Sequence, residues 1–370
     1  MRYLSANYLF PLHIDPIEEG VLQISDEGEI IDIFVNRSEV PQDKLEIFEG
    51  VLCPGFVNVH CHLELSHLLG ELPQQTGLPE FISHIPQKRG AELFIIEEAM
   101  KKADTMMKKN GIVGVGDISN TSDSFQIKQK SKIQYYTFLE IISLDDKKAE
   151  TVFHSGLELL EQCEPSVSLV PHATYSVSER LFSLLKSYNS GEVICIHNQE
   201  TKTEDELFES GSGDLFERLK QFGTIPVSGK SALQTTLPKM PKQSPIVLVH
   251  NTYTSKKDID WAASYNNQIY WCTCPKANLY IENILPDYSM FDSDKLCVGT
   301  DSLASNDSLS ILEELQIIQE NSHFEMNTLL KIASKNGAEA LGFEKLGTFE
   351  KGKVPGVNLI IDFNKLKVIL

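Results

Sequence analysis

The sequence predicts an α/β fold, a TIM-type (β/α)8 barrel joined to a small β-sandwich domain built from both termini. Three observations predict it. Apolar β-branched runs alternate with amphipathic helical stretches through the middle of the chain, residues 1–50 read as strands and turns, and β character returns near the C-terminus. We expect the barrel at 54–344, and the sandwich at 1–53 together with 345–370.

The predicted barrel strands are short, rich in β-branched residues and bounded by turn residues. They are Phe56–Cys61, Ile112–Ile118, Ile133–Ile141, Ser166–Val170, Glu192–His197, Pro245–His250, Gln268–Cys272 and Lys295–Gly299. Helical periodicity lies between them at Ile95–Asn110, Ala149–Cys163, Ser178–Tyr188, Gly213–Phe222 and Ser308–Asn321, with a last helix at Leu329–Ala340. This alternation is typical of a parallel sheet with covering helices.

The terminal segments have the period-two pattern of strands. The predicted strands are Tyr3–Tyr8, Gly20–Ile24, Ile30–Val35, Lys44–Phe48, Gly356–Asp362 and Val368–Leu370. No helical period interrupts the first fifty residues, so we expect these strands to pair in one small β domain beside the barrel.

Composition limits the classes of partner. The formal net charge of −19 would repel nucleic-acid phosphates and anionic membranes, which leaves a small molecule as the expected ligand. No run approaches the roughly 20 apolar residues that span a bilayer. Seven scattered cysteines predict a reducing compartment and a cytoplasmic protein, with Cys272 and Cys274 as packing residues at a strand end.

Polar residues cluster at the predicted carboxyl ends of the strands, where barrels place their active sites. His60 and His62 lie on one face of the first strand, because residues two apart in a strand point the same way. The others are His172, His197, Glu200, His250 and Asp301. Each taken alone reads as a solvated or turn residue. Their joint position at strand ends indicates one site.

Several motifs together resemble the amidohydrolase superfamily, in its chlorohydrolase and aminohydrolase branch. They are Pro54-Gly55-Phe56-Val57-Asn58-Val59-His60-Cys61-His62, His197-x-x-Glu200, His250-Asn251-Thr252, Cys274-Pro275-Lys276-Ala277-Asn278, Gly299-Thr300-Asp301-Ser302 with Ala304-Ser305-Asn306, and Gly352-Lys353-Val354-Pro355-Gly356. The likeness covers nearly the whole chain. Dimerisation is common in that superfamily, so a homodimer is compatible with the resemblance.

The resemblance implies one divalent metal, zinc or iron, held by His60, His62, His197 and Asp301. Residue type agrees independently, since imidazole suits zinc and ferrous iron. A second metal needs a bridging lysine or carboxylate, and Glu140 is the one carboxylate near the end of the third strand that could bridge.

The family also implies roles for the remaining strand-end residues. Asp301 takes a proton from the attacking water, Glu200 delivers one to a ring nitrogen, and His250 stabilises charge on the attacking oxygen. The expected reaction is hydrolysis of a carbon–nitrogen bond with release of ammonia.

The segment after His62 carries a finer resemblance. His60-Cys61-His62-Leu63-Glu64-Leu65-Ser66, then Phe81-Ile82 and Arg89, is similar to the aminodeoxyfutalosine deaminases of menaquinone biosynthesis, with Leu65 where that group has Phe. The resemblance implies that Glu64 and Ser66 bind the ribose or purine edge, that His172 contacts the sugar, and that Arg89 pairs with a carboxylate. A solvated Arg89 is the alternative.

Two other functions stay open. A cyclic amide of the imidazolone type, or an N-acyl substrate, could be hydrolysed with the same metal ligands. A non-catalytic barrel would be expected to lack Glu200, His250 or a ligand, and all of them are present.

Overall fold

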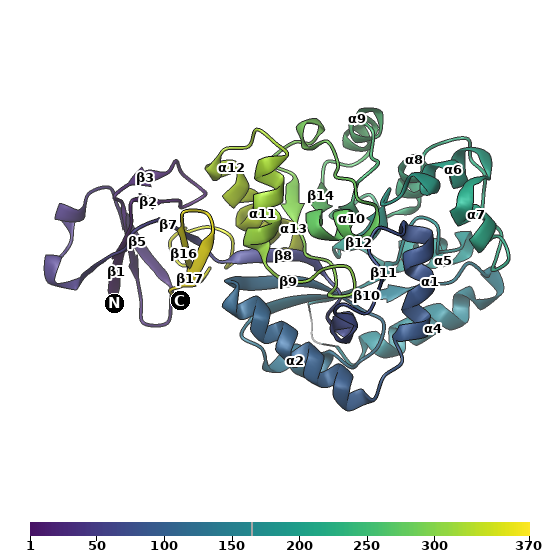
Figure 1. Cartoon of the computed structure of the whole chain (residues 1–370), viewed down its shortest axis with the longest axis horizontal. Coiled ribbons are helices and arrows are strands. Elements are labelled where there is room, and N and C mark those ends of the chain that lie inside the picture. The colour runs from purple at the N-terminus through teal and green to yellow at the C-terminus, as the bar shows by residue number, and fades with distance from the viewer. Residues whose placement is uncertain (164–165) are drawn as a thin grey trace.

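The computed structural model describes residues 1–163 and 166–370. Its larger part holds two four-stranded parallel sheets, ordered β11-β10-β9-β8 and β12-β13-β14-β15 (Figure 1). The strands are β8 (Phe56–Cys61), β9 (Ile112–Ser119), β10 (Gln134–Ile141), β11 (Val167–Pro171), β12 (Ile194–Asn198), β13 (Ile246–His250), β14 (Ile269–Thr273) and β15 (Leu296–Val298). Each lies within two residues of its predicted bounds.

The two sheets contact each other along both of their outer strands. An isolated parallel bridge pairs Ala173 with His197 between the ends of β11 and β12, and the amide of His197 donates to the carbonyl of His172 at 3.0 Å. The amides of Thr300 and Asp301, just after β15, donate to the carbonyl of His60 on β8 at 3.2 and 3.0 Å. These junctions bring the carboxyl ends of both sheets together.

Helices lie on the outside of the parallel strands (Figure 1). Five predicted helices are confirmed with small shifts, as α2 (Leu93–Lys109), α4 (Ala149–Leu160), α5 (Glu179–Tyr188), α7 (Gly213–Leu219) and α11 (Ile311–Glu320). The prediction at Leu329–Ala340 is partly wrong, because the helix starts as α12 (Met326–Leu330) and passes through a π-helical turn, η7 (Lys331–Lys335), into α13 (Asn336–Leu341).

Several helices were not predicted. They are α1 (Leu78–Lys88), α3 (Phe125–Lys130), α6 (Lys202–Ser210), α8 (Ala232–Thr236), α9 (Lys256–Tyr265) and α10 (Pro275–Ile281). Most are too short to show a clear period, and α1 contains Pro86, which normally ends a helix.

Both termini lie in a separate pair of sheets at one end of the molecule (Figure 1). The sheet orders are β5-β4-β1-β6 and β17-β16-β7-β2-β3. Their strands are β1 (Arg2–Ser5), β2 (Tyr8–Leu9), β3 (Ile17–Glu18), β4 (Val21–Ile24), β5 (Ile30–Phe34), β6 (Leu45–Ile47), β7 (Val51–Pro54), β16 (Val357–Ile361) and β17 (Lys365–Val368). Antiparallel pairing of β7 with β16 joins the two ends of the chain.

Two predicted terminal strands were wrong in their bounds. The single strand expected over Tyr3–Tyr8 is split into β1 and β2, which belong to different sheets. The last strand runs over Lys365–Val368, because a turn at Asp362 and Phe363, both with positive φ, reverses the chain earlier than expected. Asp362 and Asn364 are turn-forming residues, a signal that the prediction of a strand through Asp362 overlooked.

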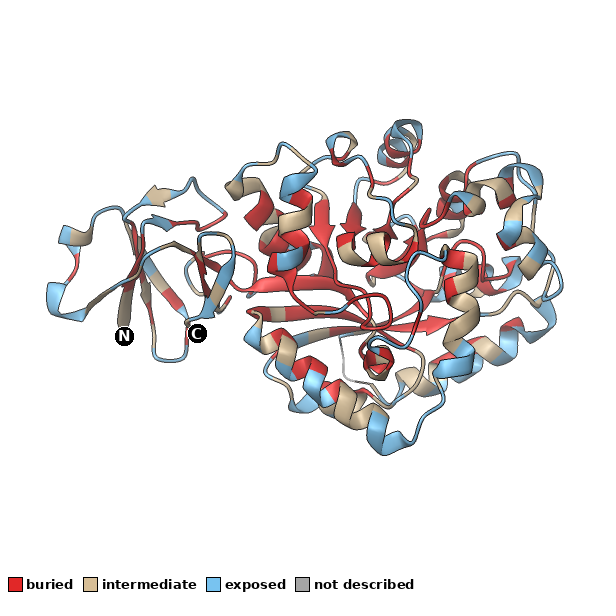
Figure 2. Cartoon of the chain, viewed as in Figure 1, coloured by how far each residue is buried: buried red, intermediate tan, exposed pale blue. Residues whose placement is uncertain are grey.

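Buried residues concentrate on the parallel strands (Figure 2). A continuous apolar core runs from these strands to the covering helices, and a smaller core containing Leu4, Leu22 and Leu359 fills the space between the terminal sheets. Within 1–163 and 166–370, no helix has both the length and the apolar character that crossing a lipid bilayer requires.

Candidate active site

Three histidines from two strands converge at the carboxyl ends of the parallel sheets. The Nε2 atom of His62 lies 3.1 Å from Nε2 of His60 and 3.3 Å from Nε2 of His197. His60 is on β8, His62 follows that strand, and His197 is on β12, so the junction between the sheets assembles the cluster. All three imidazoles direct the same nitrogen to one point.

Asp301 completes this cluster from the loop after β15. Its Oδ1 lies 3.6 Å from Nε2 of His60 and 3.4 Å from Nε2 of His62. Its Oδ2 accepts a 2.5 Å hydrogen bond from the hydroxyl of Ser305. The backbone of Asp301 has φ of 55°, a strained conformation for a residue with a side chain, and such strain is typical of functional sites.

Burial favours the neutral form of two imidazoles in the cluster, those of His62 and His197. It lowers the pKa of His62 and of His197 well below 6.5, and the surrounding histidines lower both further. Burial raises the pKa of Asp301, but its neighbours His60, His62 and His250 outweigh that effect and bring it well below 3.8. Neutral imidazole nitrogens and an ionised carboxylate are the forms that bind a metal.

The ring of His197 is oriented by a hydrogen bond at Nδ1, on the side away from the cluster. Its Nδ1 lies 2.7 Å from the carbonyl oxygen of His172, so Nδ1 carries the proton and Nε2 presents a lone pair. A carboxylate oxygen of Glu140 on β10 lies 3.7 Å from the same Nδ1 and has no hydrogen-bond partner among the residues described.

Glu140, His172 and His197 therefore form a second group of metal-type side chains. Because Nδ1 of His197 is committed as a donor, this group offers a second metal only two side chains. The geometry makes Glu140 a neighbour of His197 and gives little support to a bridging role.

Glu200 and His250 lie together beside the cluster. Oε1 of Glu200 is 3.6 Å from Nε2 of His250, and the rings of His197 and His250 stack with centroids 5.5 Å apart. Burial raises the pKa of Glu200 well above 4.5, and the charge of Asp301 adds to this effect. Burial also lowers the pKa of His250. Burial thus favours the acid form of Glu200 and the neutral form of His250, which face each other.

Asn278 sets the tautomer of His250. Its side-chain oxygen lies 2.9 Å from Nδ1 of His250, so that nitrogen donates and Nε2 is left as an acceptor. His250 has φ of 71°, a second strained residue at the site. The neutral ring can therefore accept a hydrogen bond at the atom that faces Glu200.

The backbone around Glu200 is held by Glu204 on α6. The buried carboxylate of Glu204 accepts from the amides of Gln199 and Glu200, at 3.0 and 2.7 Å, and from the hydroxyl of Thr174 at 2.8 Å. Thr201 and Glu204 form a capping box at the start of α6. The pattern Thr-x-x-Glu is visible in the sequence, so this positioning residue could have been found there.

Glu64 and Arg89 meet at the edge of the site. Nη2 of Arg89 lies 3.1 Å from Oε2 of Glu64 and also 3.1 Å from the side-chain oxygen of Asn120. Glu64 accepts further hydrogen bonds from the amides of Asn120 and Thr121 and from the Thr121 hydroxyl. Burial raises the pKa of Glu64, and the Asn120 amide opposes that rise. Glu64 is already well supplied with protein donors.

Ser66 and His172 are also engaged by the protein. The Ser66 hydroxyl donates to the carbonyl of Leu63 at 2.7 Å inside the 3-10 helix η3 (Leu63–Leu68). Nδ1 of His172 lies 2.7 Å from the hydroxyl of Ser176, and its ring centroid is 4.8 Å from that of His197. The structure therefore places His172 against the ligand cluster, and Ser66 on the helix that follows His62.

The family profile of the amidohydrolases matches residues 51–368, which is most of the chain. The chain belongs to the amidohydrolase family. It is therefore an enzyme, a metal-dependent hydrolase that acts on carbon–nitrogen bonds.

Relatives of this amidohydrolase include nucleoside deaminases. The chain is 27% identical over 365 residues to the aminodeoxyfutalosine deaminase of a Nitratiruptor species, covering 93% of this chain and 87% of that protein. It is 28% identical over 328 residues to an adenosine deaminase of Helicobacter pylori, covering 85% of this chain and 80% of that protein.

Solved structures show the same fold. Helicobacter pylori aminofutalosine deaminase in complex with methylthio-coformycin superposes with a TM-score of 0.81 at 24% identity, covering 97% of this chain and 92% of that one. An adenosine deaminase from Xanthomonas campestris with bound zinc gives a TM-score of 0.74 at 19% identity, covering 97% and 84%. Both likenesses show that this chain has the amidohydrolase fold.

The donor set fits a divalent metal. The ligand atoms of His60, His62 and His197 all lie within 4.8 Å of one another, and the three residues are buried. Three neutral imidazoles directed at one point, with a carboxylate oxygen beside them, would repel one another or stay unsatisfied without a cation between them. The hydrogen bond from Nδ1 of His197 to a carbonyl is the outer contact that histidine ligands usually make.

Proposed function

We propose that this amidohydrolase deaminates a 6-aminopurine nucleoside, with aminodeoxyfutalosine as the candidate substrate. One observation carries the proposal, the placement of a buried acid, Glu200, beside His250 and the histidine cluster. Removal of an amino group from a purine ring needs a proton donor close to the nucleophile, and a carboxylic acid with a raised pKa supplies one. The names of the relatives support the same reaction class.

For the fold, we propose that β8 to β15 close into one (β/α)8 barrel at 54–344, with 1–53 and 345–370 as a β-sandwich domain. Hydrogen bonds of Thr300 and Asp301 to His60, and the bridge from Ala173 to His197, support closure. Pairing of β7 with β16 supports a domain shared by both termini.

The proposed cofactor is one zinc ion, with iron as the alternative. Its ligands are His60, His62, His197 and Asp301, a nitrogen-rich set that suits either metal. When bound, the metal would lower the pKa of a bound water to near 7, so that hydroxide is available at neutral pH.

The side chains would then transfer protons to and from the groups around the attacked carbon. Asp301 would accept a proton from the nucleophile. Because Asn278 leaves Nε2 of His250 as an acceptor, that nitrogen would accept a hydrogen bond from the attacking water and orient its oxygen, in place of the charge stabilisation that the resemblance implies. Glu200 donates its proton to the neighbouring ring nitrogen. The proton held by Asp301 would pass to the exocyclic amine, so that the carbon–nitrogen bond breaks and ammonia leaves. Loss of the remaining hydroxyl proton to Glu200 would form the carbonyl and restore the acid.

Four residues are proposed to recognise the substrate. Glu64 and Ser66 contact the ribose or purine edge, His172 contacts the sugar, and Arg89 pairs with a carboxylate. Arg89 suits this role because 35% of its side chain is exposed, while its partner Glu64 is buried. A cytoplasmic location and a homodimer remain predictions.

Ammonia release from a panel of compounds tests the function. The panel contains aminodeoxyfutalosine, 5′-methylthioadenosine, adenosine and an imidazolone-type cyclic amide, each with zinc-loaded enzyme. We expect release from the aminopurines, highest kcat/KM for aminodeoxyfutalosine, and no turnover of the amide. Turnover of the amide alone would replace the proposal with a cyclic amide hydrolase.

A further inference from the structure

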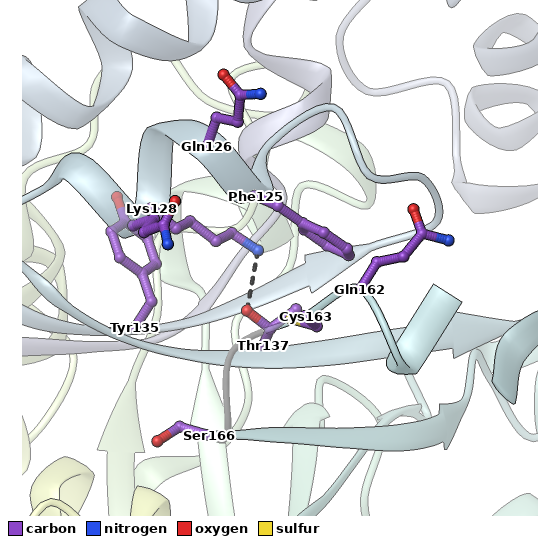
Figure 3. A pocket seen from close by; sticks show the side chains of 9 residues that line it. Phe125, Gln126, Lys128, Tyr135, Thr137, Gln162, Cys163 and Ser166 are labelled. Atoms are coloured by element: carbon purple, nitrogen blue, oxygen red, sulfur yellow. Dashed lines mark hydrogen bonds between the residues drawn. The ribbon is translucent and has the colours of Figure 1, made fainter. Parts of the chain in front are cut away.

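A buried ion pair lies behind the strand that leads to His62. Nζ of Lys128, on α3, is 2.5 Å from Oδ2 of Asp117, on β9, and the two side chains are 6% and 0% exposed. Lys128 also donates to the hydroxyls of Ser119 at 2.8 Å and Thr137 at 3.2 Å. Figure 3 shows Lys128 extending from its helix to Thr137. The cation is thus fully occupied by protein groups.

Such a pair is a poor way to gain stability. Removing two charges from water costs several kcal/mol per ion, and well-packed apolar residues of similar size are often as stable or more stable. Stability alone therefore does not explain why the Asp117–Lys128 pair is present.

The second carboxylate oxygen of Asp117 contacts the segment that follows His62. Oδ1 accepts a 2.7 Å hydrogen bond from the amide of Leu63, the residue directly after His62. Leu63 is the first residue of η3, whose N-cap, His62, makes no side-chain capping bond. The first amides of a helix have no partner within it, so Asp117 caps η3 from a neighbouring strand.

Asp117 also contacts the chain on the other side of His62. In the parallel ladder of β8 and β9, Cys61 is the register partner of Asp117. The backbone of His62 is therefore fixed at both neighbours by one residue, Cys61 through strand pairing and Leu63 through the carboxylate.

We propose that Asp117 is a positioning residue for the metal site. Held as an ion by Lys128, its carboxylate orients His62 toward the other ligands and fixes the start of the helix that carries Glu64 and Ser66. Asp117 acts through the Leu63 amide and does not touch the reacting atoms. The inference rests on the proposed metal ligands, and it extends the site to the layer between β9 and α3.

Two double variants separate the hydrogen bond from the charge. D117L/K128M replaces the ion pair with apolar side chains and deletes the acceptor for Leu63. D117N/K128M is the conservative match, because its amide oxygen can still accept from Leu63 while the charges are gone. Zinc affinity is measured by competition with a chromogenic chelator, and the unfolding midpoint is measured on the same samples.

We expect D117L/K128M to bind zinc about 10- to 100-fold more weakly, the range for lost outer contacts of metal ligands, and D117N/K128M to recover most of that affinity. Equal zinc affinity in the two folded variants would overturn the proposal, whatever their midpoints.

A second route covers the case in which D117L/K128M does not fold. D117A/K128M deletes the acceptor with a smaller side chain and removes the charges, and D117N/K128M remains its matched control. The same loss of zinc affinity is expected, and wild-type affinity would contradict the inference. Because zinc binding is measured without substrate, a failure here is distinct from a failure of the deaminase proposal, which ammonia release detects.

Discussion

Two regions of the site differ in what their polar atoms contact. They are the metal cluster, which is His60, His62, His197 and Asp301, and the rim, which is Glu64, Ser66 and Arg89. In the cluster, Nε2 of His60, His62 and His197 point at one another with the carboxylate of Asp301 beside them. At the rim, Glu64 accepts from Asn120, Thr121 and Arg89, and Ser66 is bonded within its own helix. The cluster needs a ligand from outside the chain, whereas the rim is satisfied by the protein.

This difference distinguishes the reaction class, which depends on the cluster, from substrate recognition, which depends on the rim. Three ring nitrogens that converge on one point suit a cation before substrate arrives, so the resting structure already favours metal-dependent chemistry. Substrate recognition by Glu64, Ser66 and Arg89 requires exchange of existing hydrogen bonds. Mutations should therefore change the selectivity for substrate more easily than they change metal binding.

The largest effect is expected from removing a ligand of the cluster. His197→Ala deletes one nitrogen and leaves a cavity beside Glu140, so metal content and activity should both fall to background. The loss should exceed the roughly 10- to 100-fold that outer contacts contribute to metal affinity. Metal analysis of purified protein measures it, with His154→Ala on the exposed face of α4 as the control. Full metal content in His197→Ala would remove it from the ligand set.

Glu200 should give the next largest effect while sparing the metal. Glu200→Gln keeps the shape but cannot deliver a proton, so kcat should fall by about 10²- to 10⁴-fold with unchanged metal content. Loss of metal together with activity would instead make Glu200 part of the metal site.

The pH profile of the wild-type enzyme sharpens the same point. Burial raises the pKa of Glu200 well above 4.5, so its acid form persists to higher pH than that of an exposed carboxyl group. Activity that needs this acid is complete below the raised pKa and declines as pH rises through it. The profile of kcat/KM should therefore have an alkaline limb that the residual activity of Glu200→Gln lacks. An identical limb in both proteins would assign it to another group.

Asn278 should have an intermediate effect, because it acts through His250. Asn278→Ala removes the acceptor at Nδ1 and lets the ring rotate or change tautomer, which should reduce kcat on the order of 10- to 100-fold. Asn278→Asp retains an acceptor and should recover part of the loss. Asn266→Ala, which removes a buried amide bonded to Ser244, is the matched control for stability. Equal kcat losses in Asn278→Ala and Asn266→Ala would reduce the role to packing.

The cluster could be predicted from the sequence and its supporting residues largely could not. His60 and His62 share a strand face, and strand ends of parallel sheets meet at one edge, so strand periodicity predicted that these side chains gather. The proposed set of metal ligands came from the family resemblance. Asp117 contacts Leu63, and Asn120 contacts Glu64. The two residues of each pair are more than 50 positions apart in sequence, and no local pattern encodes such contacts. Glu204 is the exception, since its capping box is local.

The same reason explains the misplaced and missing elements. The eight parallel strands are continuous apolar runs, which local sequence reports well. The turn at Asp362 and Phe363 needs a positive φ at Phe363, a bulky residue that rarely adopts it, and the helix α1 keeps Pro86 inside it. Tertiary packing overrides local preference in both places.

The smallest effect is expected at the rim, from Arg89. Arg89→Gln removes a cation that is 35% exposed, so KM for a nucleoside bearing a carboxylate should rise about tenfold with little change in kcat. Adenosine has no carboxylate, and its KM should stay near the wild-type value. Steady-state kinetics on both substrates measures the split.

Arg89 also bonds Glu64 and Asn120, and the two substrates distinguish its roles. A rise in KM confined to the carboxylate substrate means that Arg89 releases its protein partners to bind substrate. An equal rise for adenosine means that Arg89 mainly holds Glu64 in place, and Glu64→Gln should then reproduce it. In that case the rim would be a preformed structure like the cluster, and the contrast between the two regions would disappear.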